Sequence, residues 1–178
     1  KGKMKLLFAE ILTELKACGY QVSVKLFNAM YLGVPQSRER LIFIGTRNDL
    51  GVVPSHPHPT TKPVVVSDAL DNLISHEISH KGFTELQRQR YSEIKEGHAH
   101  PERFSFLRLN RSGVSNTIVK TAGSGGLAHF SQERFLSVGE LKRIASFPDC
   151  YQFFTDDWGV AVARIGNSVP PRMMQYIA

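Results

Sequence analysis

The chain contains little cysteine, with Cys18 and Cys150 the only two in 178 residues. Two thiols so far apart offer no disulfide framework, so we expect a reducing compartment rather than a secretory one. No apolar run approaches the ~18 residues of a membrane span, and no signal peptide opens the chain. These absences predict a cytoplasmic protein that does not enter a membrane.

Sets of metal-ligating residues are missing as well. The seven histidines include His76 and His80, one helical turn apart, and two His-x-His pairs. No cysteine cluster or regularly spaced third ligand accompanies them, as a structural metal site would require. We therefore expect solvated loop histidines and no metal ion.

Acidic residues are fewer than basic ones. Lys and Arg number 22 against 16 Asp and Glu, which gives a net charge of +6 and a pI near 9.5. This excess fits a polyanionic partner such as nucleic acid. The length allows one good core plus an appendage, because domains commonly hold ~100–150 residues.

The strongest pattern lies in residues 33–45, Gly-Val-Pro-Gln-Ser-Arg-Glu-Arg-Leu-Ile-Phe-Ile-Gly. Residues 41–44 form an apolar run of β-favouring side chains that ends at Gly45. Such a run predicts a strand covered on both faces within an α/β sheet.

Three polar side chains alternate just before this run. Gln36, Arg38 and Arg40 share one side of the chain if strand geometry begins at Pro35. Two planar guanidiniums and an amide would then converge on one point and suit phosphate oxygens or a base edge. The alternative is a strand entrance with solvated charges, where Glu39 pairs with either arginine.

Helical and strand patterns alternate along the rest of the chain. A strand over residues 20–27 should pair antiparallel with the central one, and four prolines make residues 51–63 an extended linker. Apolar periodicity predicts helices over residues 4–16, 67–73, 84–96, 138–147 and 168–178. The expected helix caps are Ser67 or Asp68, Thr84 in a capping box with Gln87, and Ser137.

Residues 104–120 change to short β segments around a turn at Ser112-Gly113, with a further segment over residues 117–119. We expect this region to read nucleic acid. Residues 123–126, Gly-Ser-Gly-Gly, imitate a cofactor-cradling loop, but no helical period follows them, so we expect a flexible loop near DNA. The aromatic residues Tyr151, Phe153, Phe154 and Trp158 we expect in a core rather than on a base-stacking surface.

Three motifs resemble those of the DNA (cytosine-5) methyltransferase family. Residues 33–40 before an apolar strand are similar to its Q-x-R-x-R motif, and residues 165–171, Ile-Gly-Asn-Ser-Val-Pro-Pro, to its last motif. Residues 134–140, Arg-Phe-Leu-Ser-Val-Gly-Glu, with residues 146–149, Ser-Phe-Pro-Asp, look like the motif before the last. The family often has arginine before that glutamate, where this chain has Gly139.

The resemblance implies a fold class and an activity. The fold is α/β, the C-terminal part of a Rossmann-like S-adenosylmethionine-dependent methyltransferase sheet with a small mixed α+β target-recognition region. Residues 1–53 and 132–178 would belong to the catalytic domain, and residues 54–131 to the linker and the recognition region. The implied reaction moves a methyl group from S-adenosylmethionine to carbon 5 of a cytosine flipped out of double-stranded DNA, in a bacterial restriction-modification system.

The resemblance also implies catalytic roles. Arg40 would reach the carbonyl edge of the flipped cytosine, while Arg38 and Gln36 would hold backbone or neighbouring catalytic groups.

Binding roles follow from the same motifs. Asn167, Ser168 and Val169, expected at a helix N-terminus, would border the methyl-donor pocket. The expected DNA-binding residues are Arg108, Asn110, Arg111, Thr117, Gly125 and Arg134, of which Arg134 would brace or contact the recognition region.

The parts that carry the family's covalent chemistry are absent from the sequence. It has no Pro-Cys nucleophile, Glu-Asn-Val acid or glycine-rich donor loop, and neither Cys18 nor Cys150 lies in such a context. Because it begins at Lys1 rather than methionine, we expect a truncated piece that needs an N-terminal catalytic portion. The alternatives are a natural subunit that completes a catalytic partner, and a stand-alone nucleic-acid-binding protein.

Overall fold

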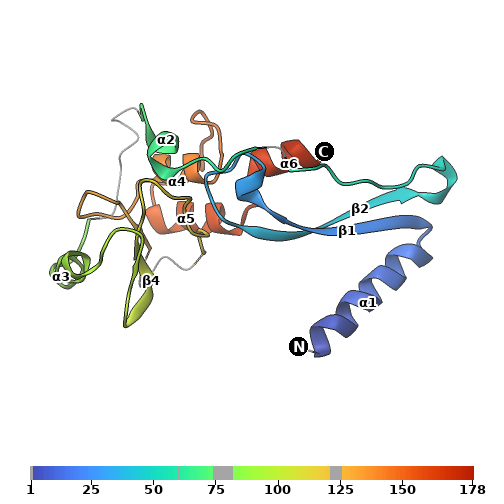
Figure 1. Ribbon diagram of the computed structural model, residues 1–178, viewed down its shortest axis with the longest axis horizontal. Coiled ribbons are helices and arrows are strands. Elements are labelled where there is room, and N and C mark those ends of the chain that lie inside the picture. Colours follow the sequence, from blue (N-terminus) through green and yellow to red (C-terminus); the bar gives the residue numbers. More distant parts are fainter. Residues whose placement is uncertain (1, 60, 74–81, 121–125) are drawn as a thin grey trace. The chain divides into compact units, whose positions relative to one another are not determined.

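The computed structural model describes residues 2–59, 61–73, 82–120 and 126–178 (Figure 1). The chain divides into two compact units. The first comprises Lys1–Phe27, Glu39–His58 and Ile177, and the second comprises Asn28–Arg38, Pro59–Tyr176 and Ala178. The division at residues 53/54 and 131/132 expected from the sequence stays a prediction.

The first unit is a helix followed by two paired strands. The helix α1 (Gly2–Ala17) ends before Gly19, which has a positive φ of 84°. The strands β1 (Tyr20–Asn28) and β2 (Glu39–Arg47) form a two-stranded sheet. The Asn48 N–H donates to the Gly19 carbonyl at 2.9 Å, so the end of β2 meets the start of β1. The predicted helix and antiparallel pair are confirmed.

The strand β2 begins later and is less buried than the sequence predicted. It starts at Glu39 rather than Pro35, and its residues alternate between exposed and half-buried. Leu41 is 46 % exposed, and Phe43, whose ring lies 5.8 Å from that of Phe8 in α1, is 36 % exposed. The expected burial on both faces is wrong, because two strands and one helix cannot cover both faces of a sheet.

After β2, a 3-10 turn η2 (Asn48–Leu50) leads into a segment without helix or strand up to Val65 in the described residues, which confirms the linker.

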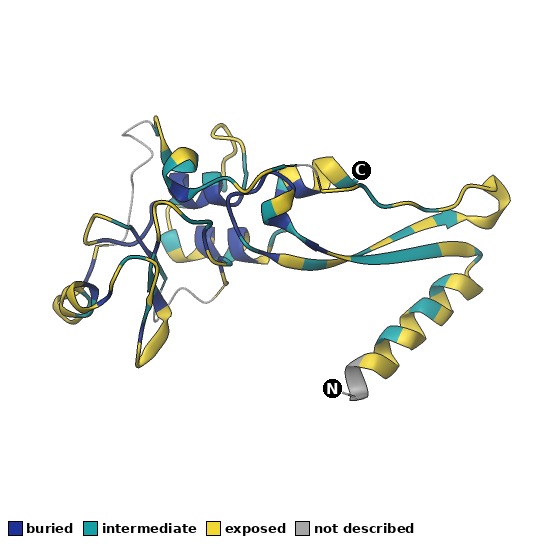
Figure 2. Cartoon of the chain, in the orientation of Figure 1, coloured by how far each residue is buried: buried dark blue, intermediate teal, exposed yellow. Residues whose placement is uncertain are grey.

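Helices form the main core of the second unit. Figure 2 shows buried residues along α4 (Val138–Ile144) and α5 (Trp158–Asn167), and α2 (Val66–Leu70) packs against α4. The core consists of Val66, Leu109, Ile118, Leu136, Leu141, Ile144, Ala145, Val162 and Ile165.

The helix boundaries follow local capping chemistry. Ser137 and Glu140 form a capping box at α4, as predicted. The sequence patterns did not reveal α5, whose N-cap Asp157 accepts the Val160 N–H. The predicted cap of α2 is wrong, because the helix already begins at Val66, without a side-chain cap.

The terminal helix α6 (Pro171–Ile177) begins three residues later than the predicted start at residue 168. Pro170 and Pro171 explain the delay, because a residue before proline is kept out of the helical region of φ and ψ.

A small second cluster lies in the region expected to read nucleic acid. The helix α3 (Glu85–Glu93) has the predicted capping box of Thr84 and Gln87. The strands β3 (Ala99–His100), β4 (Arg103–Arg108) and β5 (Leu127–Ala128) form a sheet in that order, with β4 antiparallel to β3 and parallel to β5. The buried residues of this cluster are Phe83, Tyr91, Ile94, Phe106, Ala128 and Phe135.

The aromatic residues near the C-terminus divide between core and surface. Phe153 and Trp158 pack against the main core, and the Trp158 indole N–H donates to the Leu136 carbonyl at 3.0 Å. Tyr151 is 47 % exposed and Phe154 88 % exposed, so the expectation of a core position is wrong for these two.

No described helix is long and apolar enough to cross a membrane. The described residues also contain no cluster of three or more His, Cys, Asp or Glu that could hold a metal ion, and both cysteines are exposed thiols.

Candidate functional site

The turn that follows β1 places Gln36 and Arg38 inside the second unit. A short 3-10 turn η1 (Ala29–Tyr31) reverses the chain, and the Ala29 N–H donates to the Arg38 carbonyl at 2.9 Å. Gln36 pairs with Ser115 in a parallel bridge. Gln36 is 1 % and Arg38 3 % exposed, so neither is a solvated charge at a strand entrance.

The Arg38 guanidinium joins segments that are far apart in the sequence. Its Nη1 donates to the Ile118 carbonyl at 3.1 Å, and its Nη2 donates to the carbonyls of Gly166 and Ser168 at 2.7 and 2.9 Å. Charge-assisted bonds of this kind are about twice as strong as neutral ones. Arg38 therefore fixes the segment at Ile118 and residues 166–168 to the same point.

Residues 117–120 are held further by two neighbouring contacts. The Thr117 hydroxyl donates to the Ser37 carbonyl at 2.6 Å. At Gly166, an added Cβ would lie 2.7 Å from the Val119 carbonyl carbon and the Lys120 nitrogen, so only glycine fits this approach. The segment 117–119 is not the predicted strand, because these contacts replace a strand ladder.

Gln36 is the least satisfied polar side chain near this junction. Its Oε1 is buried and has no hydrogen-bond partner among the described residues. A buried acceptor without a partner is costly, which favours a role for this amide beyond packing.

Arg40 belongs to the first unit, apart from Gln36 and Arg38. Its Nη1 donates to the Glu39 carbonyl at 2.6 Å, and the side chain is half-buried. The convergence of all three side chains stays a prediction.

Asn167, Ser168 and Val169 lie at the C-terminal end of α5, whereas the sequence predicted the N-terminal end of a helix here. Asn167 is the last residue of α5 and Ser168 its C-cap, with the Ser168 hydroxyl donating to the Ile165 carbonyl at 2.7 Å. Helix α6 starts only at Pro171. Ser168 and Val169 border a cavity of about 630 Å³, which is also lined by Phe147, Tyr151, Gln152, Phe153, Phe154 and Arg164.

Two arginines expected to bind DNA make contacts within the second unit. Arg108 donates to the carbonyls of Phe130 and Ile94 at 2.9 and 3.2 Å, and its guanidinium lies 4.4 Å from the centre of the Tyr91 ring. Arg111 is bound through its backbone and side chain to Glu96, at 2.7 and 3.2 Å. The Arg108 guanidinium is thus bonded to backbone carbonyls of the fold, whereas Arg111, with 52 % of its side chain exposed, forms a surface ion pair.

Asn110 and Thr117 have internal roles too. The Asn110 side chain accepts the Ser112 N–H at 2.9 Å and packs beside Gly97 and Gly113, which shapes the turn. The Thr117 hydroxyl is bonded to Ser37 as described above. Gly125 lies outside the described residues.

Arg134 is buried and braces α4. It is 6 % exposed, and its two terminal nitrogens donate to the Glu140 carboxylate at 2.7 and 2.8 Å. The same carboxylate accepts the Ser137 N–H at 2.7 Å and closes the capping box. Burial alone would raise the pKa of Glu140, but the hydrogen bonds from Arg134 and Ser137 lower it below its usual value.

His129 completes this buried group. Its Nδ1 accepts the backbone N–H groups of Ser131 and Gln132 at 3.1 and 3.2 Å, and its Nε2 lies 3.6 Å from Glu140 Oε1. Burial lowers the pKa of His129 from 6.5 to about 4; Glu140 opposes the shift and Arg134 reinforces it. The imidazole is therefore neutral near pH 7, with its proton on Nε2.

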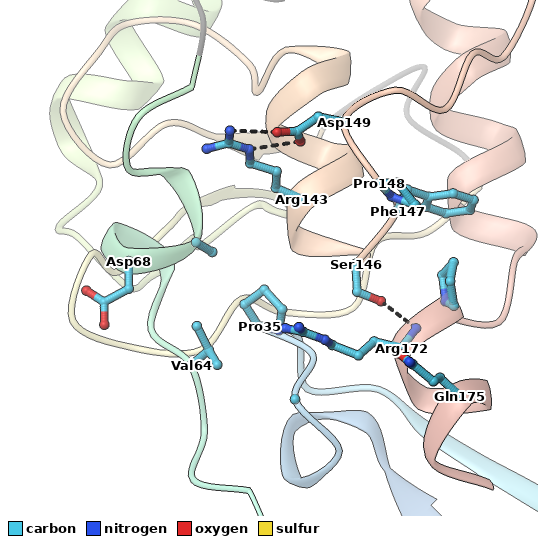
Figure 3. Close-up of a pocket in the computed structure, with 13 residues that line it drawn as sticks. Pro35, Val64, Asp68, Arg143, Ser146, Phe147, Pro148, Asp149, Arg172 and Gln175 are labelled. Carbon is cyan, nitrogen blue, oxygen red and sulfur yellow. Dashed lines mark hydrogen bonds and ion pairs between the residues drawn. The ribbon is translucent and has the colours of Figure 1, made fainter. Parts of the chain in front are cut away.

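A further cavity of about 760 Å³ lies between α2, α4 and α6 (Figure 3). Arg143 forms two bonds to Asp149, at 3.0 and 2.8 Å, and these bonds lower the pKa of Asp149. The Ser146 hydroxyl accepts the Arg172 N–H at 3.1 Å (Figure 3). No sequence pattern predicted a role for Arg143 or Arg172. Their sole sequence signal is the Ser-Phe-Pro-Asp motif, whose aspartate holds Arg143.

Comparison with known proteins extends these observations. The family model for C-5 cytosine-specific DNA methylase matches residues 1–178. The type II methyltransferase M.NgoFVII of Neisseria gonorrhoeae is 31 % identical over 95 % of this chain and 52 % of its own length, and M1.HphI of Haemophilus parahaemolyticus is 30 % identical over 96 % and 50 %. The chain thus spans about half the length of these curated relatives.

Solved structures show the same fold. A prophage-encoded E. coli protein, described as a DNA modification methyltransferase, superposes with a TM-score of 0.81 at 20 % identity, over 99 % of this chain and 64 % of that one. The S. pombe Dnmt2 methyltransferase superposes with a TM-score of 0.67 at 13 % identity, over 94 % and 59 %. At these identities the likeness establishes the fold alone.

Acid should destabilise the chain through His129. Its pKa is lower in the folded state than in the unfolded state, so its contribution is complete above about pH 6.5 and is lost as the pH falls towards about 4. The loss should reach up to about 3 kcal/mol, and protonation of Glu140 should add to it at lower pH.

Urea unfolding of the chain between pH 7 and pH 4 measures this loss. His129→Asn retains an acceptor for the two N–H groups but does not titrate, and should flatten the profile. The exposed His98→Asn is the matched control. An unchanged slope in His129→Asn would contradict the assignment.

Gly166→Ala should destabilise the chain by ~1–3 kcal/mol, because overpacking against backbone atoms forces the Val119–Lys120 peptide to move. Thermal and urea unfolding check this. Gly82→Ala is the control, since an added Cβ there meets nothing within 4 Å. Equal stability of the two variants would show that the close approach at Gly166 is unimportant.

Proposed function

The chain belongs to the C-5 cytosine-specific DNA methylase family, and from this we propose that it forms the C-terminal part of a DNA cytosine-5 methyltransferase. The complete enzyme would transfer a methyl group from S-adenosylmethionine to carbon 5 of a cytosine extruded from a specific duplex sequence. The relatives named as type II methyltransferases support a place in a restriction-modification system.

The observation that carries the proposal is the Arg38 junction. One guanidinium binds the recognition segment at Ile118 and the last family motif at Gly166 and Ser168. The sequence resembles the family in three motifs, and the first and last of these motifs meet at one buried side chain. The recognition segment and the last motif would therefore keep a fixed geometry relative to each other while the base is extruded.

The cavity beside Ser168 and Val169 fits part of S-adenosylmethionine. Its walls include the rings of Phe147, Phe153 and Phe154, which suit an adenine or the apolar methylene chain, and Arg164, which suits a carboxylate. The donor would supply the methyl group, and Ser168 and Val169 would border its pocket. Asn167, exposed at the end of α5, would lie at the edge of the same pocket.

The residues of this chain would orient the cytosine rather than attack it. Arg40 would bind the carbonyl edge of the extruded base with a planar guanidinium, and Arg38 and Gln36 would hold the backbone around it. Arg134 would act through Glu140 by fixing α4 against the recognition region. The nucleophile and the acid would come from an N-terminal portion, in the same polypeptide or in a partner subunit.

Exposed apolar side chains of the first unit support the need for that portion. Leu6 in α1, Leu26 in β1 and Leu41 in β2 are 72 %, 57 % and 46 % exposed. Apolar surface of this extent is typical of a face that other protein covers.

The chain alone should not transfer methyl groups. Incubation with donor labelled in its methyl group and cytosine-containing duplex should leave the DNA unlabelled, whereas the polypeptide or pair of subunits that includes the N-terminal portion should label carbon 5. The family's nucleophile, acid and donor loop are missing from this chain together. Label at carbon 5 with the chain alone would contradict the proposal, and label at another position would change the reaction class.

In the complete enzyme, Arg40→Ala should remove about 2–4 kcal/mol of transition-state stabilisation and so reduce turnover roughly a hundredfold or more. Duplex affinity should change little. Arg40→Lys should not restore turnover, because an ammonium lacks the planar fork. Turnover, duplex affinity and melting temperature should be measured on each variant. Arg47→Ala is the control, an exposed arginine on the same strand that pairs with Asp49 at 2.7 Å. Near-normal turnover in Arg40→Ala would remove this residue from the mechanism.

A further inference from the structure

The strand β4 carries an aromatic side chain that the fold leaves in solvent. Phe104 is 82 % exposed, whereas Phe106, two residues further on, is 2 % exposed and belongs to the recognition cluster. Burial of Phe106 anchors the strand, so Phe104 is held on a structured element rather than on a free loop. An exposed ring on such an element has a free face on which a base could stack.

Phe104 stands at the rim of a cavity of about 320 Å³ in the second unit. This volume is at the lower end of the ~300–1,000 Å³ of small-ligand pockets. Most of its lining residues are apolar, and Ser105, Asn116 and Thr117 add hydroxyl and amide groups to the lining. The apolar lining residues are Leu107, Ile118, Val119, Leu127, Leu141, Trp158 and Val162.

Residues 117–119, which also line the cavity, are hydrogen-bonded to the Arg38 junction. Ile118 accepts from Arg38, Thr117 donates to Ser37, and the Val119–Lys120 peptide packs on Gly166. The cavity is therefore a fixed distance from the last family motif within the same unit. A ligand that occupied it would be placed relative to Ser168 and the junction.

Basic side chains flank the cavity in the chain. Arg103 precedes Phe104 and Lys120 follows Val119, and both are exposed. Arg108, in contrast, is engaged by two carbonyls and by the Tyr91 ring, and the exposed Arg111 pairs with Glu96. An exposed ring, exposed cations next in sequence to the lining residues, and small polar groups in the lining match the chemistry that binds nucleobases and their phosphates.

We propose that Phe104 and the cavity beside it contact a nucleobase of the target duplex. Phe104 would stack on the face of a base that extrusion of the cytosine leaves unstacked, Asn116 and Ser105 would bond to its edge, and Arg103 and Lys120 would contact the neighbouring phosphates. This assignment rests on the proposed function and moves the DNA face from the 108–111 turn to the start of β4.

Duplex binding by the complete enzyme tests the proposal. The cognate duplex is the sequence that bisulfite sequencing finds methylated in cells that express the enzyme, and a scrambled duplex of equal length is the comparison. Phe104→Ala should weaken cognate binding on the order of tenfold, with scrambled binding and the salt slope unchanged, since stacking involves no phosphate. The melting temperature should also stay unchanged, because Phe104 contributes little to the core.

Three further variants separate stacking from other contacts. Phe104→Trp should retain cognate affinity, and Phe104→Leu, which is apolar but has no ring face, should not. Arg103→Ala should weaken both duplexes equally and reduce the salt slope by about 0.9. Leu86→Ala is the control for DNA affinity, because Leu86 on α3 is 53 % exposed and is not among the residues that line this cavity.

The possible results distinguish failure of this inference from failure of the proposed function. Wild-type methylation of carbon 5 together with unchanged cognate affinity in Phe104→Ala would overturn this inference and leave the proposed function intact. Wild-type cognate affinity in Phe104→Leu would show that an apolar contact is enough and that no ring stacks on a base, and would overturn it as well. Failure of the wild-type enzyme to methylate cytosine would overturn the proposed function itself.

Discussion

The second unit depends on one buried cation, Arg38. Arg38 is only 3 % exposed. Its guanidinium donates to the carbonyls of Ile118, Gly166 and Ser168, and the dipoles of these carbonyls compensate its charge. Burying a charge is costly unless its hydrogen bonds are satisfied, so these carbonyls must stay in place once Arg38 is buried. The guanidinium thereby links the segment around Ile118 and the end of α5 in one framework.

A second buried charge group organises the other side of this unit. Glu140 caps α4, binds Arg134 through two parallel bonds and faces the neutral His129. The residue before Glu140 is Gly139, where the family often has arginine. Gly139 is buried, and Arg134 supplies the positive charge that Glu140 pairs with in this fold.

These two groups change where a DNA-binding surface can lie. Arginines next to a turn suggest phosphate contacts, yet Arg108 and Arg111 lie over the rings of Tyr91 and Phe130, where Arg108 bonds to backbone carbonyls and Arg111 pairs with Glu96 at the surface. A guanidinium over an aromatic ring and bonded to carbonyls stabilises the region that carries it. The side chains left for a partner are those that the fold exposes, Phe104 and Arg103 among them.

The sequence by itself determined the features that depend on neighbouring residues. The capping boxes at Thr84 and Ser137, the amphipathic α1 and the proline-rich linker all follow from contacts within a few positions, and the family motifs can be identified without coordinates. Tertiary structure alone decided what each polar side chain does. Arg38 bonds across 80 residues to Ile118 and across 128 to Gly166, and α5 is stabilised by a core assembled from distant segments. Local patterns predict helices and caps because those energies are local, whereas a buried hydrogen bond depends on which distant carbonyl the completed fold brings within 3 Å.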